Sequence, residues 1–270
     1  MSQPEDICLL RHDGSGKNAF KNPLSFRYLD DNFIESDAVK IGKTFMDYLK
    51  KTKDPRIHVY CSLKDGNTEF DKQFGLPNGY DSHTIADAPS GSFVGLENTS
   101  NFNINTILRL DAPTIFLMPS ETKLLLAEAV LRNWTNGNAE VLYKEAITSS
   151  MKEQEIAYGT QGKITDEEIE TYLAQNLFST ANNTEKLQII GEQYWVATFI
   201  NGYESYANWR RTGYPKLIPT NYSGSMSPGV IPTRLPYPTD EYSINRANVD
   251  TANQQQGADK VTTHIWWDID

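Results

Sequence analysis

Small side chains at helical spacing between residues 120 and 150 constrain the fold most. Apolar residues recur there at intervals of three and four on both sides of a polar break near Asn138, which predicts two consecutive helices. Ser120 precedes the first helix as a candidate N-cap. Small residues and one ring mark the facing positions: Ala127, Ala139, Tyr143 and Ala146. Two antiparallel helices with so little bulk between them can approach closely, so the sequence predicts a helical hairpin.

The spacing within this hairpin is typical of a tetratricopeptide repeat. A single repeat of this type cannot bury its own face, because repeats are stabilised by their neighbours. No second copy occurs at a period near 34 residues. Two other helices follow instead, one opened by the capping box of Thr165 and Glu168 and one beginning at Asn183. We therefore expect residues 118–212 to form a helical block.

Residues 1–117 show little helical periodicity apart from one stretch, so we expect them to form a loop-rich region with one helix. Ser36 and Asp37 are candidate caps for that helix, which Asp54-Pro55 ends. Its apolar stripe consists of Ala38, Ile41, Phe45, Met46 and Leu49.

Two short strands are also expected in this region. Apolar and polar residues alternate from Ile57 to Cys61, which predicts a half-buried strand, and a second strand is expected from Leu24 to Tyr28. Cys8 and Cys61 leave two alternatives open, a disulfide or two thiols, and the predicted strand favours burial of Cys61.

The segment from Glu192 to Pro215 combines a helix end with a cluster of rings and guanidinium groups. The helical spacing continues to Thr198 and is lost at Asn201. The residues that follow include Tyr203, Tyr206, Trp209, Arg210, Arg211 and Tyr214. Arginine stacks on aromatic faces and forks onto carboxylates, so we interpret the Trp-Arg-Arg signature at 209–211 as a rigid structural corner.

Residues 213–270 predict an extended tail. Prolines that exclude a long helix or a central strand occur at Pro219, Pro228, Pro232, Pro236 and Pro238. Trp266 and Trp267 need a place to bury their rings, so we expect the tail to fold back onto the helices.

Charge and motifs exclude several classes of function. The net charge of −10 and the lack of a basic patch argue against nucleic-acid binding. No apolar stretch is long enough to span a membrane. Four isolated histidines stand at His12, His58, His83 and His264, and no metal-type Cys/His spacing, phosphate loop or nucleophile elbow occurs. Nothing in the sequence pairs the carboxylates that a glycosidase would need, for which the candidates are Asp81, Glu128, Glu192 and Glu204. We expect no catalytic residue, metal or cofactor.

Aromatic residues and amides on loops indicate binding instead. A flat ring stacks on the C–H face of a sugar, while amides and carboxylates take its hydroxyl groups. The loop of residues 76–81 carries this combination, so Asn78, Tyr80 and Asp81 are the candidate ligand-binding residues. The alternative is that Tyr80 only packs against its own loop.

Seven landmarks occur in the same order as in the SusD/RagB family, which the chain resembles over most of residues 54–268. They are Asp54-Pro55-Arg56, Gly75 to Gly79, Glu121 to Ala129, Glu192 to Trp195, Asn201 to Pro215, Ile231 to Pro238 with Glu241 and Asn245, and Trp266-Trp267-Asp268. The resemblance implies a mostly helical, SusD-like fold, with tetratricopeptide-type hairpins beneath an irregular, loop-rich face and few short strands. It also implies that Trp209, Arg210, Arg211, Trp266 and Trp267 are a structural signature.

The same resemblance implies a lipoprotein at the surface of the outer membrane of Bacteroidetes. Such a protein binds oligosaccharide or polysaccharide without cleaving it and delivers it to a SusC-like, TonB-dependent transporter. Residues 1–270 would be a single SusD-like domain that lacks the family's N-terminal helical repeats. The sequence also shows no signal peptide and no lipid-attachment cysteine, since no apolar run precedes Cys8.

Two other functions remain open. One is a helical-repeat scaffold that binds a protein through its hairpin groove and binds no glycan. The other is a fragment of a carbohydrate-active enzyme.

Overall fold

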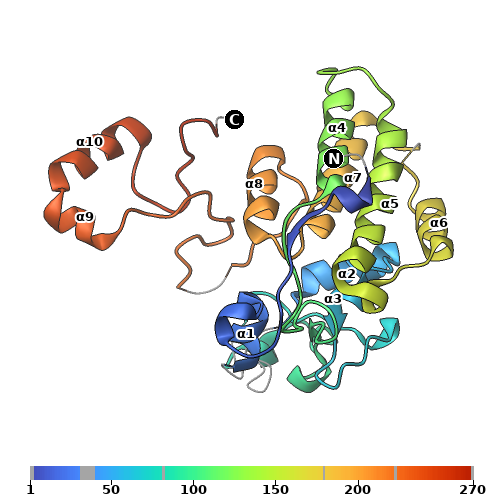
Figure 1. Ribbon diagram of the computed structural model, residues 1–270. Helices are drawn as coiled ribbons and strands as arrows, with labels where there is room; N and C mark the ends of the chain where they lie inside the picture. The colour runs from blue at the N-terminus through green and yellow to red at the C-terminus, as the bar shows by residue number, and fades with distance from the viewer. Residues whose placement is uncertain (1–2, 31–39, 81–82, 179, 222–223, 269–270) are drawn as a thin grey trace.

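The computed structural model describes residues 3–30, 40–80, 83–178, 180–221 and 224–268. Figure 1 shows a helical block, a loop-rich region beneath it and a helix pair near the C-terminus that projects to one side. The fold is mostly helical with short strands, as the sequence predicts. No helix within these ranges is long and apolar enough to cross a membrane.

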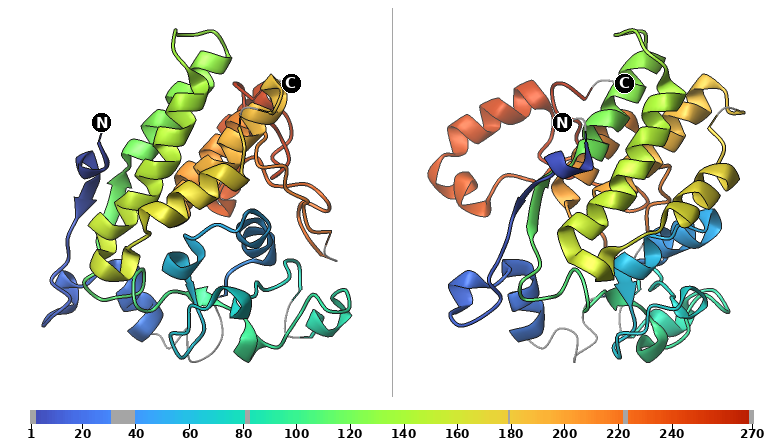
Figure 2. Two further views of the ribbon diagram at one scale, coloured as in Figure 1. Left: turned by 90° about the vertical axis from the view of Figure 1, so that its right-hand side faces the viewer. Right: turned by 45° about the vertical axis from the view of Figure 1, so that its right-hand side comes forward.

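The helical block is built around the predicted hairpin. Helices α4 (Pro119–Leu131) and α5 (Ala139–Tyr158) pack antiparallel, and α7 (Asn183–Ala197) lies against α4 (Figure 2). Helices α6 (Asp166–Gln175) and α8 (Gly202–Thr212) complete the block. The residues predicted at the hairpin interface are buried: Ala127, Ala139, Tyr143 and Ala146. Small side chains thus allow the close approach that the sequence predicts.

Side-chain caps set most helix starts in this block. Thr165 and Glu168 form the predicted capping box, and Asn138 accepts hydrogen bonds from the first turn of α5. The cap predicted at Ser120 is wrong. Helix α4 begins one residue earlier, and the Ser120 hydroxyl donates to the Glu153 carboxylate of α5 at 2.6 Å. The Ser120 hydroxyl therefore bonds to Glu153, 33 residues away, and does not cap the start of its own helix.

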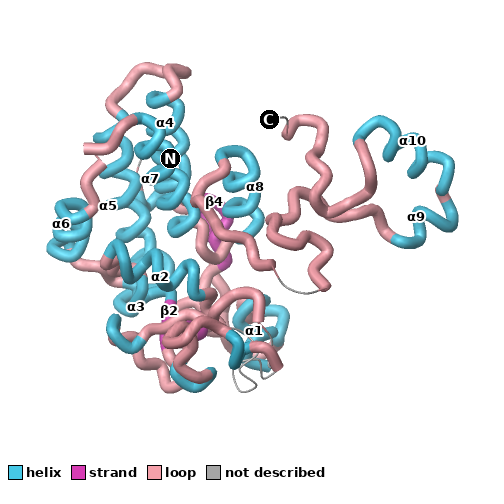
Figure 3. The backbone as a smooth tube through the Cα atoms, turned by 180° about the vertical axis from the view of Figure 1, so that it is seen from behind, coloured by secondary structure: helices cyan, strands magenta, loops and turns pink. Residues whose placement is uncertain are grey.

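In its described residues, the loop-rich region contains two small antiparallel sheets and the α-helices α1, α2 and α3 (Figure 3). Strand β1 (Cys8–Leu10) pairs with β4 (Thr114–Leu117), and β2 (Cys61–Ser62) pairs with β3 (Asn101–Phe102). The helices are α1 (Pro23–Asp30), α2 (Lys43–Thr52) and α3 (Ile57–Tyr60). Single 3-10 turns, η1 to η6, cover Pro4–Asp6, Asn18–Phe20, Phe70–Lys72, Ile85–Asp87, Leu96–Asn98 and Gly159–Gly162.

The two strands predicted in this region, from Leu24 to Tyr28 and from Ile57 to Cys61, are both wrong. Residues 24–28 lie in α1, because the Asn22 side chain accepts hydrogen bonds from the backbone N–H groups of Leu24 and Ser25 and so caps a helix. Residues 57–60 form a helical turn, and only Cys61 enters a strand. Four residues are too few to separate a period of 2 from one of 3.6.

Helix α2 is confirmed, but its start is not where we predicted it. It begins at Lys43, and Ile41 lies before the helix, where its carbonyl accepts from the Leu76 N–H and the next residue, Gly42, forms a parallel bridge with Leu76. The predicted caps Ser36 and Asp37, with Ala38, lie outside the described residues. The stripe of α2 is buried as expected at Phe45, Met46 and Leu49.

A buried polar network joins the loop-rich region to the helical block. The side chains of Asp54 and Arg56 are fully buried and form an ion pair at 2.5 Å. Arg56 also donates to Gln193 on α7 at 2.7 Å and to Ser150 on α5 at 3.0 Å. The Gln193 amide in turn donates to the Tyr172 hydroxyl on α6 at 2.7 Å. This network connects α3 to three helices at once.

The C-terminal part is less extended than predicted. Residues 202–212, at the end of the predicted helical block and interpreted as a rigid corner, form helix α8, because the Asn201 side chain caps its first turn. Helices α9 (Thr239–Ile244) and α10 (Arg246–Gln256) follow the last proline of the tail.

The structure contradicts the expected burial of one tryptophan and decides between the two alternatives left open for the cysteines. Trp267 does reach back to α8, but Trp266 is 81% exposed, so its predicted burial is wrong. The two tryptophans lie in a tight turn, in which the Asp268 N–H donates to the Ile265 carbonyl. Their rings therefore have different surroundings: Trp267 lies against Arg210, whereas Trp266 is exposed to solvent. Cys8 and Cys61 are both free thiols, and Cys61 is buried.

Candidate functional site

The predicted binding loop lines an open cleft of about 400 Å³. The N-terminal turn of α2 forms one wall, and residues 218–221 form another. Asn78 and Tyr80 both line this cleft, whereas Asp81 lies outside the described residues. The structure thus brings two of the three predicted residues together beside groups that the sequence did not connect with them.

Close backbone contacts position the loop. The Leu76 N–H donates to the Ile41 carbonyl and the Lys43 N–H donates to the Leu76 carbonyl, both at 2.7 Å. A Cβ atom on Gly75 would lie 2.4 Å from the Cα atom of Lys43, so only glycine fits there. Gly79 has a φ of +85°, and a Cβ atom on it would lie 2.9 Å from the Thr220 side chain. The loop is held between α2 and residues 218–221.

The cleft presents neutral donors and acceptors beside one ion pair. Asn78 is exposed, and its amide lies 3.4 Å from the Thr44 hydroxyl. Lys43 and Asp47 pair across one turn of α2 at 2.6 Å. Half-buried Tyr80 supplies the aromatic ring, and Thr220 and Asn221 add a hydroxyl and an amide from the far wall. These groups suit a neutral ligand that is rich in hydroxyl groups.

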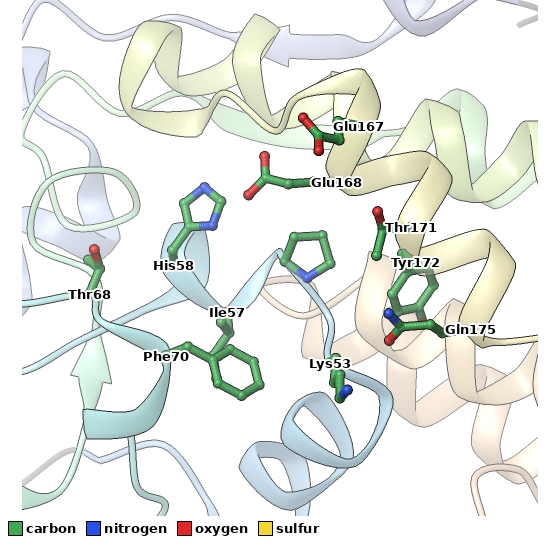
Figure 4. Close-up of a pocket in the computed structure, with 11 residues that line it drawn as sticks. Lys53, Ile57, His58, Thr68, Phe70, Glu167, Glu168, Thr171, Tyr172 and Gln175 are labelled. Carbon is green, nitrogen blue, oxygen red and sulfur yellow. The ribbon is translucent and has the colours of Figure 1, made fainter.

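A larger pocket of about 570 Å³ lies between α3 and α6 (Figure 4). Pro55, Ile57 and Phe70 give it an apolar side. In Figure 4, the His58 ring and the Glu168 carboxylate point toward one another across it. Its α6 wall carries two neighbouring carboxylates and no amide other than Gln175, so its polar groups match a neutral polyol less well than those of the loop cleft.

The Trp-Arg-Arg signature lies outside both pockets and makes packing contacts. Arg211 forks onto the two carboxylate oxygens of Glu128 on α4 at 2.7 and 2.6 Å, and Arg132 reaches the same carboxylate. Burial acts to raise the pKa of Glu128, but the hydrogen bonds from the two arginines outweigh it and lower that pKa below its usual value. The Arg210 guanidinium lies 5.3 Å from the ring of Tyr206 and 4.6 Å from that of Trp267. Helix α8 is thereby tied to α4 and to the C-terminal segment.

Sequence reasoning missed the residues that complete the loop cleft. The sequence pattern of α2 gives no reason to distinguish Lys43, Thr44 and Asp47 from any other exposed residues of a helix. The other wall is equally hidden, because Thr220 and Asn221 lie about 140 residues beyond the loop in the sequence. No local signal links these segments. The glycines of the loop, Gly75 and Gly79, are the one hint in the sequence that other backbone comes close.

Comparison with known proteins identifies the family. Residues 2–238 match a SusD-like family described as "Starch-binding associating with outer membrane". No curated protein matches the sequence.

Solved structures agree with this match. The chain superposes on a structure described as a chitin-binding protein with a TM-score of 0.78 at 28% identity, covering 100% of this chain and 57% of that one. A Bacteroidetes SusD-like protein gives a TM-score of 0.77 at 22% identity, with 100% and 63% covered. A chitin-binding SusD homologue from Flavobacterium johnsoniae gives 0.73 at 23% identity, with 100% and 56% covered.

The chain spans about three fifths of the length of these solved structures. The likenesses at 22% and 23% identity show that the fold is shared. The order of the landmarks, the helical hairpin with its loop-rich face, and the match over residues 2–238 agree. This chain belongs to the SusD-like family.

Proposed function

We propose that this chain binds oligosaccharides at the bacterial cell surface without cleaving them and delivers them to a SusC-like, TonB-dependent transporter. The observation that carries the proposal is the meeting of Asn78 and Tyr80 with the polar groups of α2 and residues 218–221 in one cleft. The family description as starch-binding and associated with the outer membrane supports it, as do the solved relatives described as chitin-binding.

The proposed binding mode follows from the chemistry of the cleft. The Tyr80 ring offers a flat face to the C–H side of a pyranose. The Asn78 amide has both a donor and an acceptor, so it can bind either lone pairs or protons of vicinal hydroxyl groups. Asp47 can accept from a third hydroxyl while Lys43 neutralises its charge. Net gains of about 0.5–1.5 kcal/mol for each hydrogen bond give the weak to moderate affinity that suits a protein that must release its ligand.

Calorimetry tests this proposal against the alternatives. The protein is titrated with chitohexaose and maltohexaose, and each mixture is then assayed for newly released reducing ends. We expect saturable heat with at least one hexasaccharide and no release of reducing ends. Absence of binding, together with co-purification of a soluble protein, would instead support the helical-repeat scaffold. Release of reducing ends would support an enzyme fragment.

Delivery to a transporter needs a separate test. We expect an affinity-tagged form of the chain to retain a TonB-dependent transporter from detergent-solubilised outer membranes. Retention by a tagged, unrelated acidic protein of similar size serves as the control, and equal retention by both would contradict the proposed partner.

A further inference from the structure

A further cleft, of about 450 Å³, lies between the C-terminal turn of α10 and residues 264–268. We call it the Trp266 cleft, and it is lined by Ala252, Gln255, Gln256, His264, Ile265, Trp266 and Asp268. The indole of Trp266 is 81% exposed, which is unusual for the largest apolar side chain. Neither the loop cleft nor the packing of α8 makes use of it.

The segment of residues 261–267 is held in place, so Trp266 is displayed on a fixed support. Its neighbour Trp267 stacks on the Arg210 guanidinium of α8, 4.6 Å from the ring centre. The Thr233 hydroxyl donates to the Thr263 carbonyl at 3.0 Å, and the Thr233 N–H donates to the Val261 carbonyl at 2.8 Å. These contacts fix the residues on both sides of the exposed indole.

The opposite wall is held through a buried ion pair. Arg234 and Asp259 pair at 2.9 Å, with side-chain exposures of 8% and 7%. Asp259 also accepts from the Tyr242 hydroxyl on α9 at 2.6 Å and from the Tyr237 N–H at 3.1 Å. Because Asp259 lies just after α10, this cluster sets the position of α10 relative to the proline-rich segment. The Trp266 cleft therefore has two anchored walls.

The groups in the cleft select one class of ligand. An exposed indole offers a flat apolar face, and the amides of Gln255 and Gln256 offer donors and acceptors beside it. The Asp268 carboxylate and the His264 ring, 3.2 Å apart, add an acceptor and a donor. Among the described residues, no lysine or arginine lines the cleft, so these residues do not offer the fixed positive charge that a phosphate-bearing ligand requires.

We propose that the Trp266 cleft is a second saccharide-binding site of this chain. A pyranose ring stacks on Trp266, and the two glutamines and Asp268 bind its hydroxyl groups. The ligand class rests on the proposed function of the loop cleft, whereas the site itself does not. Figure 1 shows α10 well apart from α2, and the two clefts have no lining residue in common.

Two sites on one chain change how a polymer binds. A polysaccharide that reaches both clefts gains from the second contact by effective concentration, which can raise overall affinity by about 10²–10⁴-fold over a single site. A ligand too short to reach both clefts at once gains nothing from the second one. The Trp266 cleft would then favour retention of long chains.

Fluorine NMR of protein labelled with 5-fluorotryptophan tests the site directly. The chain contains five tryptophans, so the spectrum is simple, and Trp266→Phe assigns the relevant signal. We expect the Trp266 signal to shift on addition of chitohexaose or maltohexaose, both in the wild type and in Tyr80→Ala. Trp134, which is 70% exposed and lies between α4 and α5, is the internal control and should not shift.

The outcomes separate the two proposals. An unchanged Trp266 signal while calorimetry still detects Tyr80-dependent binding overturns the second site and leaves the proposed function intact. A shifted Trp266 signal without any Tyr80-dependent binding overturns the loop cleft and keeps the second site. No response to either hexasaccharide by either method overturns both.

Affinity electrophoresis through soluble glycol chitin and amylose adds a polymer test. Trp266→Ala is expected to lose on the order of a hundredfold in apparent affinity for the retained polymer, whereas Trp134→Ala retains wild-type affinity. Equal retention of the two variants overturns the gain from a second site. Because Trp266 is exposed, its replacement leaves the core unchanged.

Discussion

Arg56→Met is expected to destabilise the fold by about 3–5 kcal/mol, which corresponds to a roughly 10²- to 10⁴-fold smaller folding constant. The side chains of Arg56 and Asp54 have no exposed surface, and the guanidinium donates to Asp54, Gln193 and Ser150. Methionine has a similar length but no donors. The substitution therefore leaves the Asp54 carboxylate as a buried charge without its partner and removes one donor each from Gln193 and Ser150.

Urea unfolding at pH 7, followed by circular dichroism, measures this cost. The matched control is Arg246→Met on α10, where the ion pair with Asp250 has side-chain exposures of 65% and 48%, and where a cost below about 1 kcal/mol is expected. The double variant Asp54→Leu, Arg56→Met should be less destabilised than Arg56→Met, because it buries no unpaired charge. Equal costs for Arg56→Met and Arg246→Met would refute this reasoning.

Two further predictions concern a buried acid and the binding loop. Burial, and next the charge of Glu204, raise the pKa of Glu121 to about 7 from a usual value of 4.5. The folded state keeps this proton where the unfolded chain has lost it, so the contribution of Glu121 to stability falls as pH rises between those values. The Tm of Glu121→Gln relative to wild type should therefore be higher at pH 8 than at pH 5, and a pH-independent difference would contradict this. Gly79→Ala should weaken hexasaccharide binding in calorimetry, because its Cβ atom would meet Thr220, whereas Gly91→Ala, also at positive φ but with no neighbour within 4 Å, should not. Equal affinities of the two glycine variants would exclude a role for the fixed loop.

The sequence predicted the parts of the fold that local patterns determine. The capping box at Thr165 and the small residues Ala127 and Ala146 act within a few turns of helix, and the structure confirms the helices that they mark. The prediction of short segments was less successful, because a few residues do not determine the backbone period. Residues 57–60 are nearly all buried, so their apolar character does not reveal which period the backbone follows.

Contacts between distant segments were beyond the reach of a single sequence. Gln193 lies 137 residues from Arg56, and nothing near either residue predicts their hydrogen bond. In the candidate site, too, the residues of one loop could be predicted and the residues of distant segments could not. Asn78 and Tyr80 stood out through the composition of one loop, while Asp47 and Thr220 became part of the cleft only through the packing of three separate segments.

Calorimetric comparison of Tyr80→Ala with Tyr203→Ala tests the central claim most directly. Both changes remove a tyrosine ring, but Tyr80 lines the loop cleft, whereas Tyr203 is 91% exposed on α8 and lines none of the clefts described above. The account predicts that Tyr80→Ala weakens binding of the hexasaccharide by about tenfold or more, the effect of losing roughly 1.4 kcal/mol, and that Tyr203→Ala leaves it unchanged. Equal affinities of the two variants for the hexasaccharide would contradict it.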